Sequence, residues 1–426
     1  MTTAAPTHTT ACPNCQTAYF LTGDNFGHRT VCLNCGHNFH LLPKCDDAPT
    51  LIVGPESHQE EANSLIGRLW LDLRAGQIVG ERYAVVRSLG QGGLSRVFKV
   101  KDLEDNSSPA ALKLPLAATL DRVPRRVFVD EAVAWLKPAP HPNLVGCKRV
   151  ITVMGHPVII MEYIEGSDLA RLMTGAQSHN FYRGRHPGPF SRLMDTFIQV
   201  TRGLKYAHSI GLMQLDIKPR NILLESDGRA LLSDYGPLSG GLLQKVKQTA
   251  GPTAGEGQLA PKANPALTNT STGNVMGTYQ YFSPEAINGR PSQGAGADLW
   301  ALSLTILECF LGHRPWEIGS LAGQGLENYL RTIQQKVPIP PPLAEYFRRA
   351  LADNPLNRHQ NAGEVEEELL SVYTEVTKRP YPRPAPEPAQ ESAEQRLDRT
   401  ESLKALGLSA KEAAVLARPA LKLVSG

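Results

Sequence analysis

The stretch that decides the fold is residues 210–236, IGLMQLDIKPRNILLESDGRALLSDYG. Its hexapeptide D-I-K-P-R-N, residues 216–221, forms a polar turn between two apolar segments. The tripeptide D-Y-G, residues 234–236, follows a short hydrophobic strand that begins after a Ser-Asp-Gly turn. The pattern therefore predicts that carboxylate, ammonium and amide groups gather at fixed spacing around two turns.

Phosphoryl transfer needs a cradle and a cation for the nucleotide phosphates, oxygen ligands for Mg²⁺, and a carboxylate that positions the attacking hydroxyl. The chain offers candidates for each in sequence order. Residues 89–97, LGQGGLSRV, join two predicted strands, and glycines there let backbone N–H groups approach phosphate oxygens. Taken alone this motif is weak, because a glycine-rich hairpin turn without a ligand explains it equally well.

The cation candidate is Lys113, which lies on a predicted apolar strand 23 residues after Gly90. Glu131 lies on the next helical stretch, RRVFVDEAVAWL, where it is placed to pair with Lys113 and orient it. For either residue alone, an ordinary surface charge is the simpler explanation. The order of the motifs, more than any single one, carries the interpretation.

The long-range pattern divides this region into a strand-rich part and a helix-rich part. Alternating segments such as RYAVVRSLG, RVFKVKDL and PAALKL come first. Apolar residues at three- and four-residue spacing follow, in FSRLMDTFIQVTRGLKYAHS, DLWALSLTILECFLG and LAEYFRRALAD. A strand-rich lobe is therefore expected to precede a helical one.

Residues 210–236 resemble the catalytic loop and metal-binding loop of the eukaryotic-type protein kinases, and the likeness extends over about residues 77–375. This resemblance implies an α+β, two-lobed protein-kinase fold with a strand-rich small lobe and a helical large lobe. Further landmarks fall in the order that the family requires: HPNLV at 141–145, VIIMEYIEGSDL at 158–169, GTYQYFSPE at 277–285, Asp298-Leu299-Trp300, and Arg358, which resembles the arginine that pairs with Glu285.

The resemblance also implies roles for the residues of the loop. Asp216 would orient the substrate hydroxyl and accept its proton, and Lys218 would neutralise the transferring phosphoryl group. Asn221 and Asp234 would hold Mg²⁺. For ATP, the implied contacts are the phosphate grip of Lys113 with Glu131 behind it, the glycine loop with Gly90 and Gly92, and an adenine slot lined by Leu89, Val97 and Ala111.

Lys218 together with Thr278 resembles the serine/threonine branch, so the implied activity is that of a serine/threonine protein kinase acting on protein substrates. The chain departs from the family before the catalytic aspartate, where Gln214 and Leu215 replace the usual His-Arg. The missing arginine removes the best partner of an activation-loop phosphate, which predicts activity without phosphorylation of residues 236–277. The alternative is an inactive pseudokinase that serves as a nucleotide-binding scaffold.

A separate module is predicted at the N-terminus. Cys12, Cys15, Cys32 and Cys35 give C-x2-C-x16-C-x2-C, the spacing of a four-thiolate zinc ribbon, and the segment resembles the short ribbons of many bacterial proteins. Redox-active or oxidised C-x-x-C pairs are the alternative. Few fixed positive charges surround these cysteines, so nucleic acid is a poor candidate for a ligand, although a ribbon that senses nucleic acid stays a third hypothesis. A structural or protein-docking role is favoured.

Amino-acid composition and apolar runs bear on the possible partners and the cellular location of the protein. The 426 residues are 41% hydrophobic and 20% charged with a formal net charge of +3, which fits folded globular domains and names no partner. No apolar run long enough for a membrane span or a signal peptide is apparent, and the cysteine pattern suits a reducing compartment, so a cytoplasmic location is expected.

The predicted organisation has five parts. They are a zinc ribbon (1–45), a linker (46–76), the kinase domain (77–375), a proline-rich linker (376–392) and a short C-terminal helical segment (393–426). The proline-rich part, PYPRPAPEP, favours an extended polyproline II conformation and is a second candidate for docking a partner.

Overall fold

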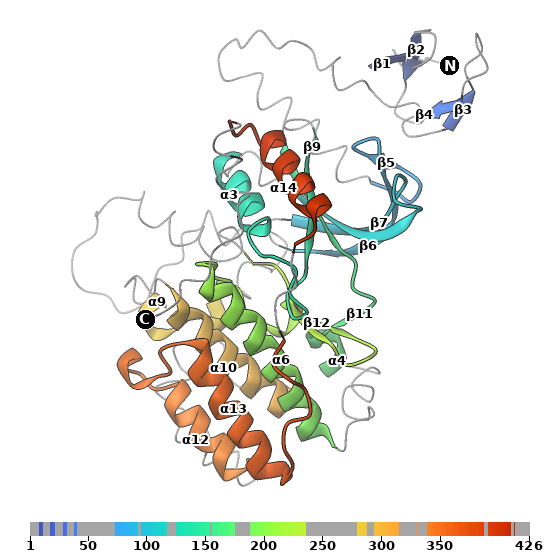
Figure 1. The fold of residues 1–426 in the computed structure, drawn as a ribbon. Helices are drawn as coiled ribbons and strands as arrows, with labels where there is room; N and C mark the ends of the chain where they lie inside the picture. Colours follow the sequence, from blue (N-terminus) through green and yellow to red (C-terminus); the bar gives the residue numbers. More distant parts are fainter. Residues whose placement is uncertain are drawn as a thin grey trace, which may run out of the picture. The chain divides into compact units, whose positions relative to one another are not determined.

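The computed structural model describes most of residues 73–409 (Figure 1). The described residues are 73–92, 95–116, 125–153, 156–174, 188–235, 279–287, 294–314, 330, 339–386, 391–409 and 413, together with the backbone of four short N-terminal strands. The chain forms two compact units, one made of Met1–Val129, Lys148–Tyr163 and Glu401–Leu408, the other of Asp130–Cys147, Ile164–Thr400 and Ser409–Gly426.

The first unit is built on a six-stranded sheet of order β5-β6-β7-β8-β10-β9. Apolar residues on its strands, such as Phe98, Val100 and Leu112, are completely buried. Asn106 and Ser107 take positive φ values of 46° and 60° in the turn between β7 and β8, as a tight hairpin requires. The strands are β5 (Ile78–Val79), β6 (Tyr83–Gln91), β7 (Ser95–Asp102), β8 (Ser108–Pro115), β9 (Cys147–Val153) and β10 (His156–Glu162).

Four short strands precede this sheet in the sequence. β1 (His8–Ala11) pairs with β2 (Ala18–Leu21), and β3 (Arg29–Val31) pairs with β4 (Asn38–His40), both antiparallel. The two C-x-x-C sequences connect the strands of each pair. The four cysteines themselves lie outside the described residues.

The second unit is mainly helical, with one small sheet of order β11-β12-β13. Its helices pack alongside one another, with α6 against α10 and α13 (Figure 1). The sheet strands are β11 (Gly166–Asp168), β12 (Ile222–Glu225) and β13 (Ala230–Leu232). The helices that lie wholly in this unit are α4 (Leu169–Met173), α6 (Pro189–Ser209), η3 (Pro219–Asn221), η4 (Tyr279–Tyr281), α9 (Pro284–Ile287), α10 (Ala295–Leu311), α12 (Pro341–Ala350), η5 (Pro355–Asn357) and α13 (Ala362–Thr377). The residues of α3 (Arg125–Trp135) and of α14 (Ala393–Ala405) are divided between the two units.

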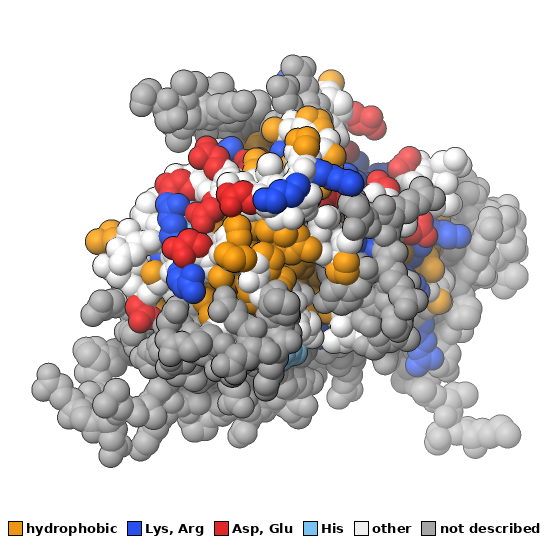
Figure 2. Space-filling view, turned by 90° about the horizontal axis from the view of Figure 1, so that it is seen from below, with side chains coloured by type: hydrophobic (Ala, Val, Ile, Leu, Met, Phe, Trp, Pro, Cys, Tyr) orange, Lys and Arg blue, Asp and Glu red, His pale blue; other side chains and the backbone are white. Residues whose placement is uncertain are grey.

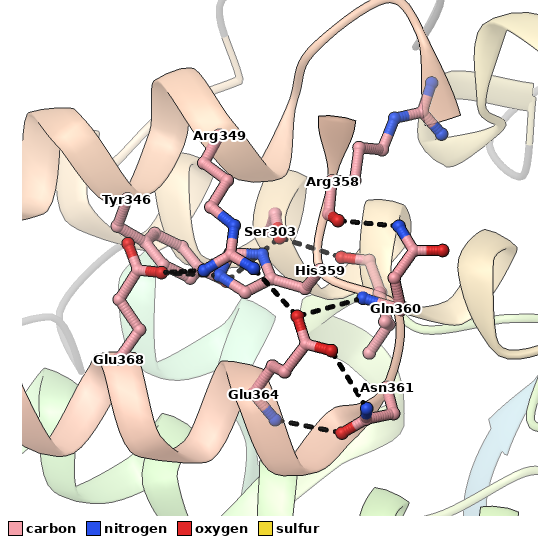
Figure 3. Close-up of polar contacts among 10 residues, drawn as sticks. Ser303, Tyr346, Arg349, Arg358, His359, Gln360, Asn361, Glu364 and Glu368 are labelled. Carbon is pink, nitrogen blue, oxygen red and sulfur yellow. Dashed lines mark hydrogen bonds and ion pairs between the residues drawn. The ribbon is translucent and has the colours of Figure 1, made fainter. Parts of the chain in front are cut away.

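Local signals explain where these helices begin and end. α13 is capped at its N-terminus by Asn361, whose side-chain oxygen accepts a hydrogen bond from the backbone N–H of Glu364 at 3.0 Å, while Glu364 accepts from the Asn361 amide (Figure 3). α10 ends at Gly312, which adopts the left-handed conformation with φ 75°. The strand-rich region followed by a helix-rich region matches the predicted order.

Polar contacts join α10, α12 and α13 (Figure 3). Ser303 Oγ lies 2.9 Å from the hydroxyl oxygen of Tyr346, and both side chains are buried. Arg349 donates to Glu364 and Glu368, at 2.8 and 3.1 Å. The three helices are therefore fixed by specific hydrogen bonds as well as by apolar packing.

The surface of this fold is mixed. On the face seen from below, apolar side chains gather in a patch, and acidic and basic side chains lie along one side of it (Figure 2). Among the described residues, no helix combines the length and the apolar character that crossing a membrane would require.

The predicted pair between Arg358 and Glu285 is confirmed. Arg358 Nη1 and Nη2 donate to the two Glu285 oxygens at 2.8 and 3.1 Å, and its guanidinium lies 4.4 Å from the centre of the Trp300 ring. Burial tends to raise the pKa of Glu285, but Arg358 outweighs it, so the pKa is lowered. The pair therefore stabilises the fold above the ordinary glutamate pKa, and this contribution is lost as the pH falls.

We predict that Arg358→Met lowers the free energy of unfolding by about 3–5 kcal/mol at pH 7, because it leaves Glu285 without its cation in a half-buried site. Urea unfolding followed by circular dichroism measures the effect. Arg348→Met is the control: its partner Glu345 is 73% exposed, so a change within about 0.5 kcal/mol is expected. The Arg358→Met effect should shrink at pH 4, and an equal loss at both pH values would contradict the assignment.

Candidate active site

The loop at residues 210–221 is anchored by hydrogen bonds to one buried carboxylate. Asp298, at the start of α10, is completely buried and accepts the backbone N–H groups of Gln214 and Leu215 at 2.9 and 2.7 Å. His208 Nε2 lies 2.8 Å from the same carboxylate. These bonds hold Leu215 at φ 63°, a conformation rare for a branched side chain. Asp298, which the resemblance marked only as one of the family's landmarks, therefore connects α10 to the loop through hydrogen bonds.

Asp216 lies at the centre of a compact polar cluster. Lys218 Nζ donates to its two carboxylate oxygens at 2.8 and 2.7 Å. Asn221, placed by the short helix η3, donates from Nδ2 to the Asp216 carbonyl and to Oδ2 at 2.8 and 2.9 Å. Three residues predicted from the sequence are thus brought together within one loop.

Electrostatics favour proton acceptance at Asp216. Burial raises its pKa above the ordinary aspartate value, and the neighbouring Asp234 charge adds to this, while Lys218 and Asn221 act in the opposite direction. A carboxylate with a raised pKa is a stronger base toward a hydroxyl proton. Asp216 is therefore suited to orienting and deprotonating a nucleophile.

Gln214 links this loop to the D-Y-G sequence. Its side-chain oxygen accepts from the backbone N–H of Asp216 at 2.6 Å, and its Nε2 donates to the carbonyls of Ser233 and Asp234 at 2.9 and 3.2 Å. The side chain is completely buried. One amide group therefore sets the spacing between the two loops, in the position where the resemblance leads one to expect histidine.

Tyr235 fastens the D-Y-G sequence on its other side. Its hydroxyl donates to the Val145 carbonyl at 2.6 Å, and its ring stacks on Trp135 of α3 with centroids 4.2 Å apart. The tyrosine is almost fully buried. A phenylalanine there would keep the stacking but would leave the carbonyl without this donor.

The residues predicted to hold Mg²⁺ have suitable chemistry. Mg²⁺ prefers oxygen ligands, and Asn221 and Asp234 supply an amide oxygen and a carboxylate. Because Asn221 Nδ2 faces Asp216, its amide oxygen is turned away from that residue. Asp234 takes φ 57°, which redirects the chain at this point. Among the described residues there is no group of three or more histidine, cysteine, aspartate or glutamate side chains that suits a metal ion.

The candidate ATP contacts of the first unit lie in register across the sheet. Gly90 on β6 is opposite Val97 on β7, and Val97 is opposite Lys113 on β8. Ala111 is two residues from Lys113 and shares its face. Leu89 directly precedes Gly90, and Gly92 closes the hairpin by donating its N–H to the Ser95 carbonyl at 2.8 Å.

The two described glycines of the turn differ in the space around them. A Cβ atom built on Gly90 would meet no atom within 4 Å, whereas one on Gly92 would lie 3.7 Å from the Ser95 carbonyl oxygen. Lys113 is 7% exposed and Glu131 is 4% exposed. These two residues belong to different units, so their pairing stays a prediction.

Comparison with known proteins agrees with this geometry. The protein kinase domain model matches residues 83–361, well over half of the chain. The chain therefore belongs to the protein kinase domain family.

Among its relatives are two bacterial proteins. A probable serine/threonine-protein kinase of Clostridium perfringens (strain 13 / Type A) is 27% identical over 68% of this chain and 38% of its own length. The probable serine/threonine-protein kinase PknB of Lactococcus lactis is 23% identical over 72% of this chain and 44% of its own. The chain thus spans less than half the length of these relatives. Among solved structures, the Mycobacterium tuberculosis PknI kinase domain is 23% identical, with a TM-score of 0.47, over 70% of this chain and 98% of that domain.

Sequence reasoning missed two contributions to the site. It treated Gln214 only as a departure from the family and named Tyr235 only as part of the D-Y-G sequence. The buried hydroxyl of Tyr235 and the two-ended amide of Gln214 find partners that are distant in sequence. The signal available beforehand was that both side chains are polar in a predominantly apolar stretch, so each needed a partner once buried.

We predict that Gln214→Leu lowers the turnover of ATP·Mg²⁺ by about 10- to 100-fold and raises the Mg²⁺ concentration for half-maximal activity, because the two loops lose their common tether. Gln214→His should restore part of the loss, since a neutral imidazole both accepts and donates.

Gln199→Leu is the matched control for Gln214→Leu. Gln199 is another buried amide, bonded to the Gly228 carbonyl and the Ala230 N–H at 3.0 and 3.1 Å, away from the two loops. It should lower stability and leave the Mg²⁺ dependence unchanged. An unchanged Mg²⁺ dependence in Gln214→Leu would contradict the hypothesis that Gln214 fixes the spacing between the two loops.

Proposed function

We propose that the chain is a serine/threonine protein kinase that transfers the γ-phosphate of ATP to protein hydroxyl groups. The observation that carries the proposal is the cluster of Asp216, Lys218 and Asn221 on one anchored loop, tied through Gln214 to Asp234. These are the groups that phosphoryl transfer requires. The names of the bacterial relatives support the same reading.

In this mechanism Asp216 accepts a hydrogen bond from the substrate hydroxyl and takes its proton as the new P–O bond forms. The bond between the γ-phosphorus of ATP and the β–γ bridging oxygen breaks in the same step, and ADP leaves. Lys218, whose ammonium lies against the Asp216 carboxylate, provides positive charge beside the transferring group. Asn221 and Asp234 would hold Mg²⁺, which when bound offsets the negative charge of the phosphates. Lys113 would orient the phosphates over the glycine turn.

Specificity for serine and threonine is also a proposal. It rests on Lys218, two residues after the base, and on Thr278, both of which resemble the serine/threonine branch. Protein substrates and a cytoplasmic location belong to the same proposal.

We predict that the unmodified chain labels itself or a generic protein substrate with radioactive ATP and Mg²⁺, and that Asp216→Asn and Asp234→Ala lower the rate by about 100-fold or more. Phosphoamino-acid analysis of the product should give phosphoserine and phosphothreonine. If all three proteins label equally weakly and yet bind ATP, the alternative of a nucleotide-binding scaffold replaces this proposal.

Activity without activation-loop phosphorylation is part of the proposal. Leu215 stands where the family has the arginine that binds the loop phosphate, and its backbone N–H donates to Asp298. Six of the hydroxyl residues of this segment, which lies outside the described residues, are Thr249, Thr253, Thr268, Thr270, Ser271 and Thr272.

We predict that a chain with these six residues replaced by alanine keeps most of its kinase activity, because Leu215 cannot bind a phosphate. Initial rates on a protein substrate measure this. A phosphatase-treated sample of the unmodified chain is the control and should also stay active. An inactive six-alanine chain that still binds ATP would count against the idea.

We also propose that the N-terminal module is a zinc ribbon that docks a protein partner. Each C-x-x-C sequence connects two strands that pair antiparallel, β1 with β2 and β3 with β4, the arrangement in which a four-thiolate site is usually built. The proline-rich segment is a second candidate for docking. Nucleic acid has little electrostatic support as a ligand.

We predict about one Zn²⁺ per chain by metal analysis of protein purified without added zinc, with Cys12→Ser and Cys32→Ser each lowering it severalfold, because a four-thiolate site loses a ligand. Cys45→Ser is the matched control, since Cys45 lies outside the four-cysteine pattern, and it should leave the zinc content unchanged. Equal zinc content in all the variants would rule the site out.

A further inference from the structure

Residues that follow the part of the chain matched by the family model pack against the helical unit. After α13 ends, residues 379–386 run alongside α6 (Figure 1). Tyr381 donates its hydroxyl hydrogen bond to Asp195 Oδ1 at 2.7 Å, and Arg383 Nε donates to the same oxygen at 2.9 Å. Asp195 is 3% exposed. One buried carboxylate of α6 therefore receives two donors from this segment.

A buried arginine on α6 donates hydrogen bonds to the backbone of the same segment. Arg202 Nη1 donates to the carbonyls of Arg383 and Pro384 at 3.2 and 2.7 Å, and its guanidinium lies 5.1 Å from the centre of the Tyr381 ring. Its Nε is held by Glu366 of α13 at 2.7 Å. Arg202 lies two helical turns after Asp195, so both side chains are on one face of α6.

The sequence of the segment suits this site. Alternating prolines lack backbone N–H groups and favour an extended chain whose carbonyls are free of helix or sheet bonds. Such carbonyls are available to an arginine donor, and a stiff segment loses little conformational entropy when it binds. The Tyr381 ring also packs edge-on against Tyr373 of α13, with centroids 5.2 Å apart.

The segment leads to a second contact on the same unit. Glu391 and Arg399 form an ion pair of 2.7 Å in which both side chains are almost completely buried. Arg399 Nη2 also donates to the carbonyl of Pro138 at 3.3 Å. Pro138 follows α3, the helix that carries Glu131, and the adjacent Ala139 N–H donates to Tyr206 of α6 at 2.9 Å. The C-terminal segment therefore touches the short stretch that follows α3.

We propose that Asp195 and Arg202 form a binding site for an extended Tyr-Pro-Arg-Pro peptide, occupied by the chain's own residues 381–384, and that this docking places Arg399 against Pro138, which follows α3, and thereby steadies that helix. The contacts define the class of ligand. The peptide must supply a phenol and a guanidinium that donate to Asp195, and carbonyls flanked by prolines that accept from Arg202. The peptide site is independent of the proposed kinase activity, whereas its effect on α3 rests on it.

The peptide site is tested with a fluorescent synthetic peptide of residues 378–386 and the full chain. The double variant Tyr381→Ala/Arg383→Ala vacates the site and should bind the peptide, while the unmodified chain should bind it at least ten times more weakly. Adding Asp195→Asn to the double variant should abolish binding. Arg379→Ala, an exposed arginine of the same segment, is the matched control and should behave as the unmodified chain.

Circular dichroism and ATP binding establish that each variant is folded. Tyr381→Phe, which removes only one hydroxyl, is measured in parallel and should bind the peptide more tightly than the unmodified chain does. Absence of peptide binding to a folded double variant, or equal binding to all variants, would overturn the site.

The effect on α3 is tested by kinetics on the same proteins. Because Glu131 is the expected partner of Lys113, loosening α3 should raise the KM for ATP severalfold in the vacated chain and in Arg399→Leu, with a smaller change in kcat. An unchanged KM in both would reject the link to α3. If the unmodified chain has no kinase activity, the proposed function fails, and the peptide measurement still decides the binding site.

Discussion

The carboxylate of Asp298 is the constraint on which the rest of the site depends. A fully buried carboxylate is stable only when donors surround it, and here two backbone N–H groups and a histidine do so. Meeting that requirement forces the chain at Leu215 into a left-handed conformation. The turn that results presents Asp216 to Lys218 and Asn221. The geometry of the candidate base therefore follows from the need to solvate one buried charge.

The departures from the family sequence have structural roles. Gln214 is uncharged at any physiological pH, yet its amide bridges the Asp216 N–H and the carbonyls before and at the D-Y-G sequence. Tyr235 adds a hydrogen bond to Val145 that a phenylalanine could not make. Together they hold the D-Y-G sequence from both sides. This arrangement accords with a site whose order comes from internal hydrogen bonds and does not depend on a loop phosphate.

Much of the fold could be predicted from local patterns. The sequence predicted the alternating strands β6 to β8 and the amphipathic helices α6 and α12. It also predicted the pairing of Arg358 with Glu285. The docking of the proline-rich segment was not. Residues 376–392 were predicted to be a linker because prolines prevent helix and sheet formation, but the same property makes their carbonyls available to Arg202. That boundary stays a prediction, whereas the contacts are an observation.

The sequence by itself determined the chemistry of the site, because Asp216, Lys218 and Asn221 lie within six residues of one turn. Their local spacing brings these three side chains together regardless of what packs around the turn. It also determined the order of strands and helices, through their periodicity. The tertiary structure alone decided the partners of Gln214, Tyr235 and Arg202, since their contacts join residues 19, 90 and 182 positions apart. Such pairings leave no periodic trace, because burial and hydrogen-bond satisfaction select them only after the elements have packed.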